Sequence, residues 1–217
     1  SIDLHYWPTP NGLKITFALH EMELPYRLHL VDIGAGEQFR PEFLAIAPNN
    51  RMPAIVDPDG PDGAPISIFE SGAILQYLGR KTGRFYGTSE RERVEIEQWL
   101  FWQRGGVGPM AGQAHHFLRY APSLEPPQDL PYAKDRYRGE VARLYGVLDR
   151  RLADRDYVAG DYSIADMAIW PWYGKLALNQ SYGDAGAFLE THSYKHVQRW
   201  TAEVGARPAV ERGCMVN

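Results

Sequence analysis

The chain has 217 residues and a formal net charge of −4, with 44% hydrophobic and 23% charged residues. This composition is ordinary for a globular protein of one large or two small domains, and the charge indicates no nucleic-acid or membrane-surface partner. One cysteine, Cys214, excludes an internal disulfide and the C-x-x-C chemistry of thioredoxins. Since we find neither a signal-peptide pattern nor a run of about 20 apolar residues, we expect a cytoplasmic, reducing setting.

The first 83 residues alternate between strand and helix patterns. They predict a strand over Ile2 to Trp7, a helix over Leu13 to Met22 and a second strand over Tyr26 to Ile33. A short helix interrupted by a proline, two short apolar strands and a helix that Gly83 ends follow at Gln38 to Ile46, Ala54 to Asp57, Ile66 to Phe69 and Ser71 to Thr82.

Strand patterns vanish after about residue 86, and helical patterns take over. A long one runs from Arg91 to His116, and an amphipathic one from Tyr137 to Leu152. Two more helices are predicted, roughly over Ile164 to Leu178 and Ser193 to Val204. We therefore predict an α/β domain over residues 1–83 and an all-helical domain over residues 88–217.

The segment Thr9-Pro10-Asn11-Gly12 joins the first strand to the first helix. Asn11 is a good N-cap, and the helix behind it offers free backbone N–H groups and the positive end of a dipole. Such a position suits a developing anion, including a thiolate. A turn and a cap without chemistry would produce the same pattern, so both interpretations stay open here.

The segment Asn50-Arg51-Met52-Pro53-Ala54 leads into a predicted strand. The N-terminal proline of a strand has no N–H to donate to a ladder. A cis bond between Met52 and Pro53 would turn the Met52 backbone outward, where it could pair with a peptide-like ligand. Because only about 5–6% of X–Pro bonds in folded proteins are cis, the spacing alone predicts trans.

The segment Phe69-Glu70-Ser71-Gly72 joins a strand to a helix start. We expect Ser71 to cap this helix and to leave N–H groups for a carboxylate, while Glu70 faces a ligand ammonium. The pair would then hold both ends of an α-amino-acid group. An ordinary helix start is the simpler interpretation of this fragment taken alone.

A further pattern concerns folding. Ser163 and Asp166 are spaced as the N-cap and N3 residues of a capping box, with Asp in place of the usual Glu. Tyr162 and Met167 are placed for a hydrophobic staple around the same helix start. We therefore expect these residues to fix a helix rather than to carry chemistry.

Taken together and in this order, these segments resemble the glutathione transferases over essentially the whole chain. The resemblance rests on N-x-M-P-A-I-V-D, F-E-S-G-A-I-L-Q-Y-L and S-I-A-D-M-A-I-W-P-W. Within that superfamily, P-T-P-N-G, G-E-Q-F-R-P-E-F, Q-W-L-F-W-Q and G-P-M-x-G-Q-x-H-H-F are similar to the bacterial Nu class, which is related to the yeast Ure2 nitrogen regulators. The resemblance implies a thioredoxin-like first domain with a cis Pro53, followed by the helical second domain.

The resemblance also implies a glutathione site. Thr9 and Asn11 match the residues that approach the glutathione sulfur, and Glu70 with Ser71 matches the γ-glutamyl clamp. The remaining matches are the backbone of Met52 beside Pro53 for the cysteinyl unit, Gln38 near the glycyl end and Arg136 for a ligand carboxylate. The match at Arg136 is the least sharp, because the segment around it aligns less well.

A tyrosine, a pair of histidines and the cysteine each need a separate interpretation. Tyr6 corresponds to the early tyrosine that holds the thiolate in some transferase classes, but the loop of Thr9 and Asn11 is the better match. His115 and His116 resemble a metal pair, yet adjacent helical residues face different ways, so we expect a structural role or a wall of the second-substrate pocket. Cys214 lies near a terminus that we expect to be mobile, and we interpret it as incidental.

The implied function is that of a glutathione-dependent disulfide-bond oxidoreductase with weak transferase or peroxidase activity. Glutathione is its co-substrate, and it needs neither a catalytic cysteine nor a metal. Two alternatives stay open: a transferase that conjugates glutathione to electrophiles, and a non-catalytic glutathione-binding regulatory module. The family also implies a homodimer, to which we expect the aromatic residues of 99–102 and 117–120 to contribute.

Overall fold

The computed structural model describes residues 1–175 and 190–217, which form two compact units. The N-terminal unit comprises Ser1–Thr88 together with Ala206–Asn217, and the helical unit comprises Ser89–Gly205. The last residues of the chain thus pack with the first ones, whereas the sequence analysis grouped them with the second domain. The domain boundaries at residues 83 and 88 stay a prediction.

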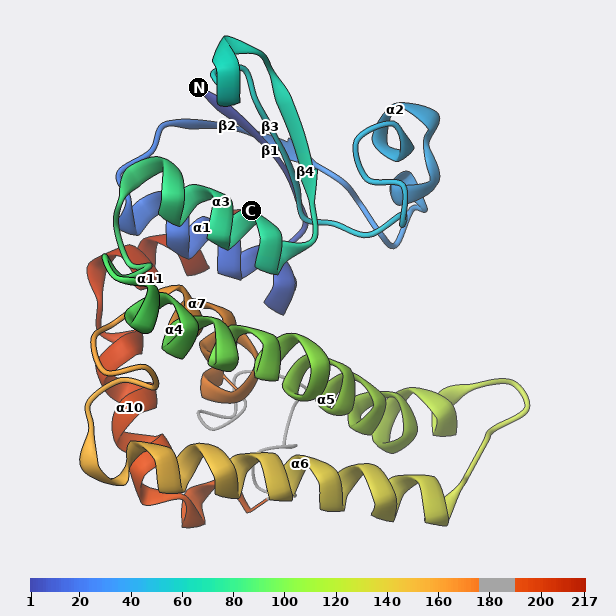
Figure 1. Ribbon diagram of the computed structural model, residues 1–217. Helices are drawn as coiled ribbons and strands as arrows, with labels where there is room; N and C mark the ends of the chain where they lie inside the picture. Colours follow the sequence, from blue (N-terminus) through green and yellow to red (C-terminus); the bar gives the residue numbers. More distant parts are fainter. Residues whose placement is uncertain (176–189) are drawn as a thin grey trace. The chain divides into compact units, whose positions relative to one another are not determined.

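A four-stranded mixed sheet is the centre of the N-terminal unit (Figure 1). Its strands follow the order β2-β1-β3-β4, with bounds Tyr26–Leu30, Ile2–Tyr6, Ala54–Asp57 and Ile66–Phe69. β1 runs parallel to β2 and antiparallel to β3, and β3 runs antiparallel to β4. Because side chains alternate along a strand, Ile2, Leu4 and Tyr6 all point into the core from β1.

Helices α1 and α3 lie side by side on one face of this sheet, and α2 lies apart from them (Figure 1). The helices of the unit are α1 (Pro10–Glu21), α2 (Pro41–Leu44), α3 (Ser71–Thr82) and α11 (Pro208–Cys214), with 3₁₀ turns at Glu37–Phe39 and Pro61–Gly63. The bounds of α3 agree with the prediction, and Gly83 ends it in a left-handed conformation with φ 67°. These elements confirm the α/β fold expected of the first half.

The C-terminal segment packs against α1 through α11 and accepts hydrogen bonds from β1 and α1. The Tyr6 hydroxyl donates to the carbonyl of Val216 at 3.0 Å, and the Thr16 hydroxyl to that of Gly213 at 3.1 Å. The sequence patterns indicated no helix here. The expectation that Cys214 lies in a mobile end is wrong, because this residue ends a helix that packs against α1.

The described part of the helical unit consists of helices and their connections, and it confirms the all-helical second half. Its α-helices are α4 (Glu90–Trp102), α5 (Gly108–His115), α6 (Pro131–Arg151), α7 (Ile164–Ile169) and α10 (Lys195–Gly205). π-Helical turns lie at Gln103–Val107, His116–Tyr120 and Trp170–Gly174, and 3₁₀ turns at Ala121–Ser123, Leu152–Asp154 and Thr191–Ser193. The end of the predicted helix Ile164 to Leu178 lies outside the described residues.

The predicted capping box at the start of α7 is confirmed. The Ser163 hydroxyl accepts from the N–H of Ala165 at 3.2 Å, and the Asp166 carboxylate accepts from the N–H of Ser163 at 3.1 Å. The other carboxylate oxygen of Asp166 accepts from Val158 N–H at 3.1 Å and from the Trp200 indole at 2.9 Å. Burial raises the pKa of Asp166 to about 6, although these hydrogen bonds oppose the rise.

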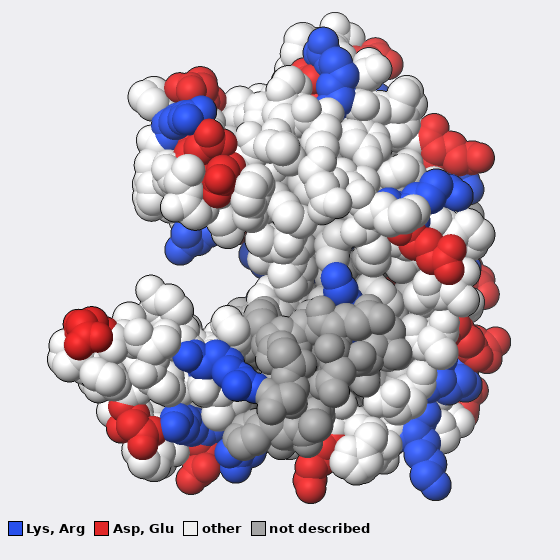
Figure 2. All heavy atoms as spheres, turned by 180° about the vertical axis from the view of Figure 1, so that it is seen from behind, with Lys and Arg blue, Asp and Glu red and all other residues white. Residues whose placement is uncertain are grey.

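Surface charge is mixed on the face seen in Figure 2. Acidic and basic side chains are interspersed over the described residues of that face rather than gathered by sign. Because this surface has no single sign of charge, an anionic ligand would have to be held by local donors.

Within residues 1–175 and 190–217, no helix combines the length and the apolar content that crossing a membrane requires.

Candidate functional site

Three of the segments singled out from the sequence meet at one edge of the sheet. The register pairs His5 of β1 with Ala54 of β3, and Ala54 with Phe69 of β4. Because β3 runs against both neighbours, the ends of β1 and β4 lie beside the start of β3. The chain segments that follow β1 and β4 and the one that precedes β3 therefore lie together at this edge (Figure 1). These segments contain Thr9, Ser71 and Pro53.

Thr9 links the first two segments through its hydroxyl. This group accepts from the backbone N–H of Gly12 at 3.3 Å and donates to the thioether sulfur of Met52 at 3.4 Å. Thr9, with φ −115° and ψ 165°, is thus the N-cap of α1, and Pro10 takes the first helical position. The expectation that Asn11 is the cap is wrong, because the helix begins one residue before it.

The start of α1 packs tightly against the end of β1. A Cβ atom at Gly12 would lie 2.8 Å from the Tyr6 ring and would clash with the carbonyl oxygen of Trp7. Only glycine therefore allows the first turn of α1 to lie this close to the strand. This contact holds the first turn of α1, which contains Asn11, against the end of β1.

The second segment has the cis bond that the family resemblance implies. The Met52–Pro53 peptide bond is cis. Met52 is 8% exposed and belongs to a buried apolar cluster, together with Val31, Phe43, Ala47 and Ala54. The position of this segment is thus set by core packing as well as by its place at the start of β3.

The third segment has an unusual backbone. Glu70 is the N-cap of α3 and has φ 73° and ψ 111°, a region that non-glycine residues rarely adopt. Such conformations cost about 1–3 kcal/mol and are concentrated at functional sites. The expectation that Ser71 caps α3 is wrong, because Ser71 is the first helical residue and Glu70 precedes it without a side-chain cap hydrogen bond.

Lys14 is the residue of this region that our sequence analysis missed. Its side chain is fully buried and donates from Nζ to the Ser71 hydroxyl oxygen at 3.3 Å, while Ser71 itself is 3% exposed. The contact ties α1 to the first turn of α3. The sequence did offer a clue, since Lys14 shares a helix face with the buried residues Phe17 and Ala18, three and four positions later.

Two further predicted ligands lie outside this convergence. Gln38 sits in the 3₁₀ turn Glu37–Phe39, where its amide nitrogen donates to the carbonyl of Ile33 at 3.4 Å. Its amide oxygen is buried without a hydrogen-bond partner in the described structure. Arg136 lies on α6 of the helical unit and is exposed. Their roles toward a ligand stay predictions.

Tyr6 is poorly suited to activate a thiol. Its side chain is fully buried, and its hydroxyl is engaged with the carbonyl of Val216. Burial, with the nearby Cys214 and Tyr26, raises the pKa of Tyr6 to about 12. The hydroxyl therefore holds the C-terminal segment, which supports the choice of the Thr9 loop over Tyr6.

The paired histidines lie on the helical unit. His115 ends α5 and His116 begins the following π-helical turn, and burial lowers the pKa of His115. Among the residues that the structure describes, no group of three or more His, Cys, Asp or Glu side chains could hold a metal ion.

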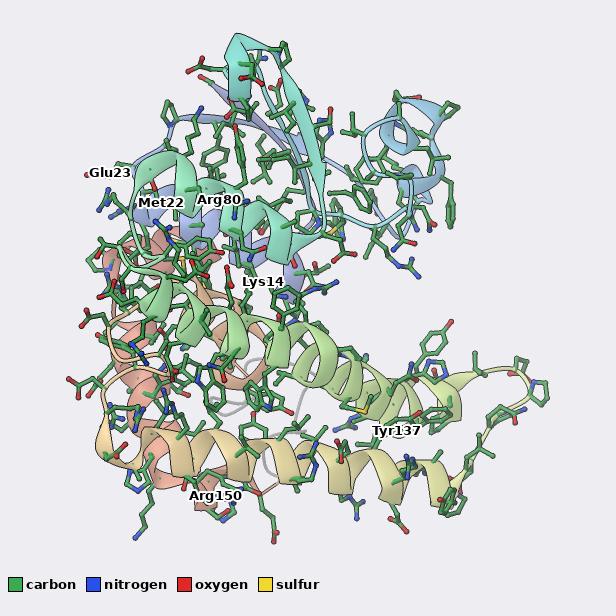
Figure 3. The ribbon with its side chains drawn as sticks, viewed as in Figure 1. Lys14, Met22, Glu23, Arg80, Tyr137 and Arg150 are labelled. Atoms are coloured by element: carbon green, nitrogen blue, oxygen red, sulfur yellow. The ribbon has the colours of Figure 1, made fainter. Side chains whose placement is uncertain are left out.

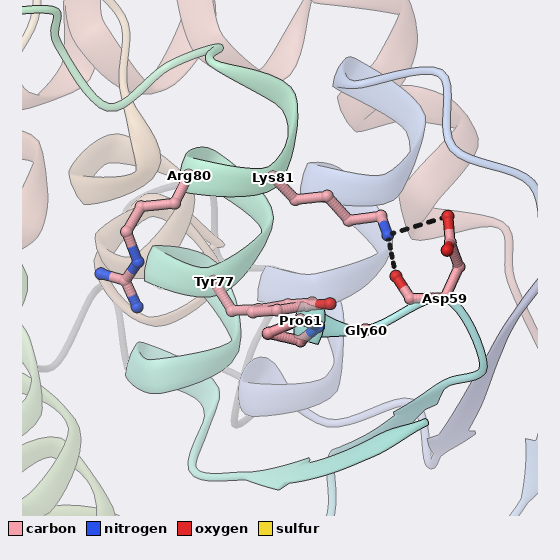
Figure 4. A pocket seen from close by; sticks show the side chains of 6 residues that line it. All are labelled: Asp59, Gly60, Pro61, Tyr77, Arg80 and Lys81. Carbon is pink, nitrogen blue, oxygen red and sulfur yellow. Dashed lines mark hydrogen bonds and ion pairs between the residues drawn. The ribbon is translucent and has the colours of Figure 1, made fainter. Parts of the chain in front are cut away.

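A hollow of about 350 Å³ lies at the opposite end of β3 and is distinct from the candidate site (Figure 4). The Lys81 amine pairs there with the Asp57 carboxylate at 2.9 Å and donates to the carbonyl of Asp59 at 2.6 Å. Tyr77 donates to the same carboxylate at 2.7 Å, so Lys81 and Tyr77 both pair with Asp57 at this end. The lining is formed by Asp59, Gly60, Pro61, Tyr77, Arg80 and Lys81.

Comparison with known families gives two matches along the chain. Residues 9–81 match the N-terminal domain of glutathione S-transferases, and residues 113–208 match the C-terminal domain. The first match spans all three segments at the sheet edge. The two matches occur in the order that the sequence analysis implied, an N-terminal α/β half and a helical half.

Individual relatives are similar over nearly the whole chain. The chain is 50% identical over 210 residues to the disulfide-bond oxidoreductase YfcG of Escherichia coli, covering 96% of this chain and 92% of the relative. A Pseudomonas putida glutathione transferase, solved with one glutathione disulfide per subunit, superimposes with a TM-score of 0.93 at 41% identity, covering 99% and 91% of the two chains. A Burkholderia graminis glutathione transferase, solved with two glutathione molecules per subunit, gives a TM-score of 0.91 at 45% identity, covering 98% and 87%.

Proposed function

Because the chain belongs to the glutathione S-transferase family, we propose that it is a disulfide-bond oxidoreductase that uses the thiol of bound glutathione. The observation that carries the proposal is the convergence of Thr9, Met52 and Ser71 at one sheet edge. The name of the Escherichia coli relative and the glutathione disulfide in the Pseudomonas putida structure support the same chemistry.

Glutathione would lie across this edge. The Ser71 hydroxyl and the backbone N–H groups at the start of α3 suit its α-carboxylate, and the Glu70 carboxylate suits its ammonium. The backbone of Met52 would pair with the cysteinyl unit. Gln38 would approach the glycyl end, and Arg136 would reach a ligand carboxylate.

The sulfur would then lie near Thr9 and Asn11 at the start of α1. A free thiol has a pKa of about 8.5, so only about 3% is thiolate at pH 7, and lowering that pKa by about two units requires roughly 2.7 kcal/mol. A hydrogen bond to a charged group contributes about 1.5–3 kcal/mol, and a helix N-terminus about 0.3–1 kcal/mol. The Thr9 hydroxyl, which already donates to a sulfur atom at 3.4 Å, and the helix start can therefore supply the stabilisation together.

Disulfide reduction would proceed in two exchanges. The glutathione thiolate attacks one sulfur of the substrate disulfide, forms a mixed disulfide and releases the other substrate sulfur as a thiolate, which takes up a proton. A second glutathione thiolate attacks the glutathione sulfur of the mixed disulfide. The products are two reduced substrate thiols and oxidised glutathione, so the protein contributes positioning and charge stabilisation while the redox atoms belong to its ligands.

Two other functions compete with this proposal. A transferase that conjugates electrophiles would use the same activated sulfur, and weak transferase or peroxidase activity is compatible with the proposed site. The engagement of Tyr6 with Val216 counts against the tyrosine-based activation of other transferase classes. A non-catalytic regulatory module would bind glutathione without turnover.

The decisive comparison measures glutathione-dependent reduction of bis(2-hydroxyethyl) disulfide beside conjugation of 1-chloro-2,4-dinitrobenzene. We expect saturable disulfide turnover well above the rate with glutathione alone, and conjugation that is much slower. Efficient conjugation with little disulfide turnover would favour the transferase. Glutathione binding without either reaction would favour the regulatory module.

We also propose that the protein is a cytoplasmic homodimer with domains over residues 1–83 and 88–217. Phe101 and Tyr120, in the aromatic stretches expected at the dimer contact, are 63% and 54% exposed. Exposed aromatic side chains are enriched at protein interfaces. Light scattering at micromolar concentration is expected to give twice the chain mass, and a monomer would refute the dimer.

A further inference from the structure

The buried contact between Lys14 and Ser71 has a direction. A lysine ammonium has three donors and no acceptor, whereas a hydroxyl can both donate and accept. When Nζ donates to the Ser71 oxygen at 3.3 Å, the hydrogen of that hydroxyl must point to another partner. The Ser71 hydroxyl therefore accepts from Lys14 and donates its own hydrogen to a different group.

The surroundings of Ser71 favour an anion as that partner. Ser71 is the first residue of the 12-residue helix α3, whose unpaired N–H groups and dipole give this end a partial positive charge. Lys14 adds a full positive charge beneath the same turn (Figure 3). Because Lys14 is 0% exposed, solvent screens its charge little, and that charge acts strongly on the Ser71 hydroxyl beside it.

We propose that Lys14 is a positioning residue of the glutathione site, an inference that rests on the proposed function. It turns the Ser71 hydroxyl toward the γ-glutamyl α-carboxylate and holds a positive charge behind it. A hydroxyl polarised by an ammonium is a stronger donor, because hydrogen bonds in a chain reinforce one another. Lys14 therefore selects for ligands that carry a carboxylate at this end, without touching them.

The test compares two ligands by calorimetry on the full chain. Glutathione has the α-carboxylate, and 4-aminobutyryl-cysteinyl-glycine lacks only that group. Lys14→Met keeps the length and apolar stem of the side chain but removes the donor and the charge. Arg80→Met is the matched control, because it removes an exposed cation from the other end of α3 (Figure 3).

We expect Lys14→Met to weaken glutathione binding about tenfold, equivalent to about 1.4 kcal/mol. Its affinity for the analogue should stay within about twofold of wild type, since a hydrogen bond to a charged group is absent there. The control should change neither affinity. Because Lys14 acts through Ser71, the Lys14→Met, Ser71→Ala double variant should lose little more than Ser71→Ala alone.

Equal losses of affinity for both ligands in Lys14→Met would show a merely structural role and overturn the inference. Unchanged glutathione affinity in that variant would also overturn it. So would a double variant in which the affinity losses of Lys14→Met and Ser71→Ala add up. If Lys14→Met does not fold, Lys14→Gln is the replacement. Its neutral amide offers both a donor and an acceptor, so the Ser71 hydroxyl no longer has to donate to a different group, and the same selective loss is expected. Selectivity equal to wild type in that variant would contradict the proposal.

The two proposals fail in different ways. A protein that binds glutathione in a Lys14-dependent manner but reduces no disulfide would refute the proposed function and leave this inference intact. A reductase whose glutathione binding responds to Ser71→Ala but not to Lys14→Met would do the reverse.

Discussion

Thr9 has two separable tasks, and replacing it by alanine should affect both. As the N-cap of α1 it accepts from Gly12 N–H, and losing such a cap costs about 1 kcal/mol of unfolding free energy. As the proposed donor to the glutathione sulfur it contributes about 1.5–3 kcal/mol. At about 1.36 kcal/mol per unit, Thr9→Ala should therefore raise the pKa of the bound thiol by about 1–2 units.

The assay is a pH titration of thiolate absorbance in the glutathione complex, beside urea unfolding of the free protein. Ser89→Ala is the matched control, because Ser89 caps α4 by accepting from Glu92 N–H at 3.2 Å. It should cost a similar unfolding free energy and leave the thiol pKa unchanged. Thr9→Ser should restore both quantities.

A Thr9→Ala variant that loses stability while the pKa of its bound thiol stays at the wild-type value would refute the role of the hydroxyl. Asn11 and the N-terminus of α1 would then have to stabilise the glutathione thiolate. Asn11→Ala tests that outcome without removing the N-cap, since the cap is Thr9.

Three further results are expected. Tyr6→Phe should lower the unfolding free energy by about 1 kcal/mol, because it removes the hydrogen bond to Val216, and should leave disulfide turnover unchanged. Loss of turnover without loss of stability would contradict the structural role assigned to Tyr6. Met52→Leu should lower the pKa of the bound thiol, since the Thr9 hydroxyl no longer has the thioether as a competing acceptor; an unchanged thiolate titration would argue otherwise. Because burial raises the pKa of Asp166 to about 6, above its unfolded value, its contribution to stability is complete below pH 4 and is lost as the pH rises through 6. Urea unfolding should therefore show the advantage of wild type over Asp166→Asn shrinking across that interval, and a constant difference would contradict it.

Local patterns were sufficient where neighbours along the chain decide the structure. Helix α3 was predicted with its bounds, because its apolar face and the terminating Gly83 are both local features. The capping box of Ser163 and Asp166 was predicted for the same reason. The cis bond before Pro53 was implied by the family resemblance, since spacing alone favoured trans.

Features that depend on distant partners were missed or misplaced. Thr9 and Asn11 are both good caps, and only the packing of the first turn against β1 decides for Thr9. The contact between Tyr6 and Val216 spans 210 positions, so no local pattern indicates that the last residues pack with the N-terminal unit. Likewise, the burial of Lys14 becomes intelligible only when α3 brings Ser71 beside it, 57 positions later.

The central claim is that glutathione supplies all the sulfur chemistry, and Cys214→Ser tests it most directly. The chain has no other cysteine, and this one lies at the end of α11, in the unit that also contains the proposed site. The measurement is the steady-state reduction of bis(2-hydroxyethyl) disulfide by glutathione, with wild type and Cys214→Ser compared at equal glutathione occupancy. We predict equal kcat and KM for the two proteins. A Cys214→Ser protein that folds and binds glutathione but no longer reduces the disulfide would contradict the account.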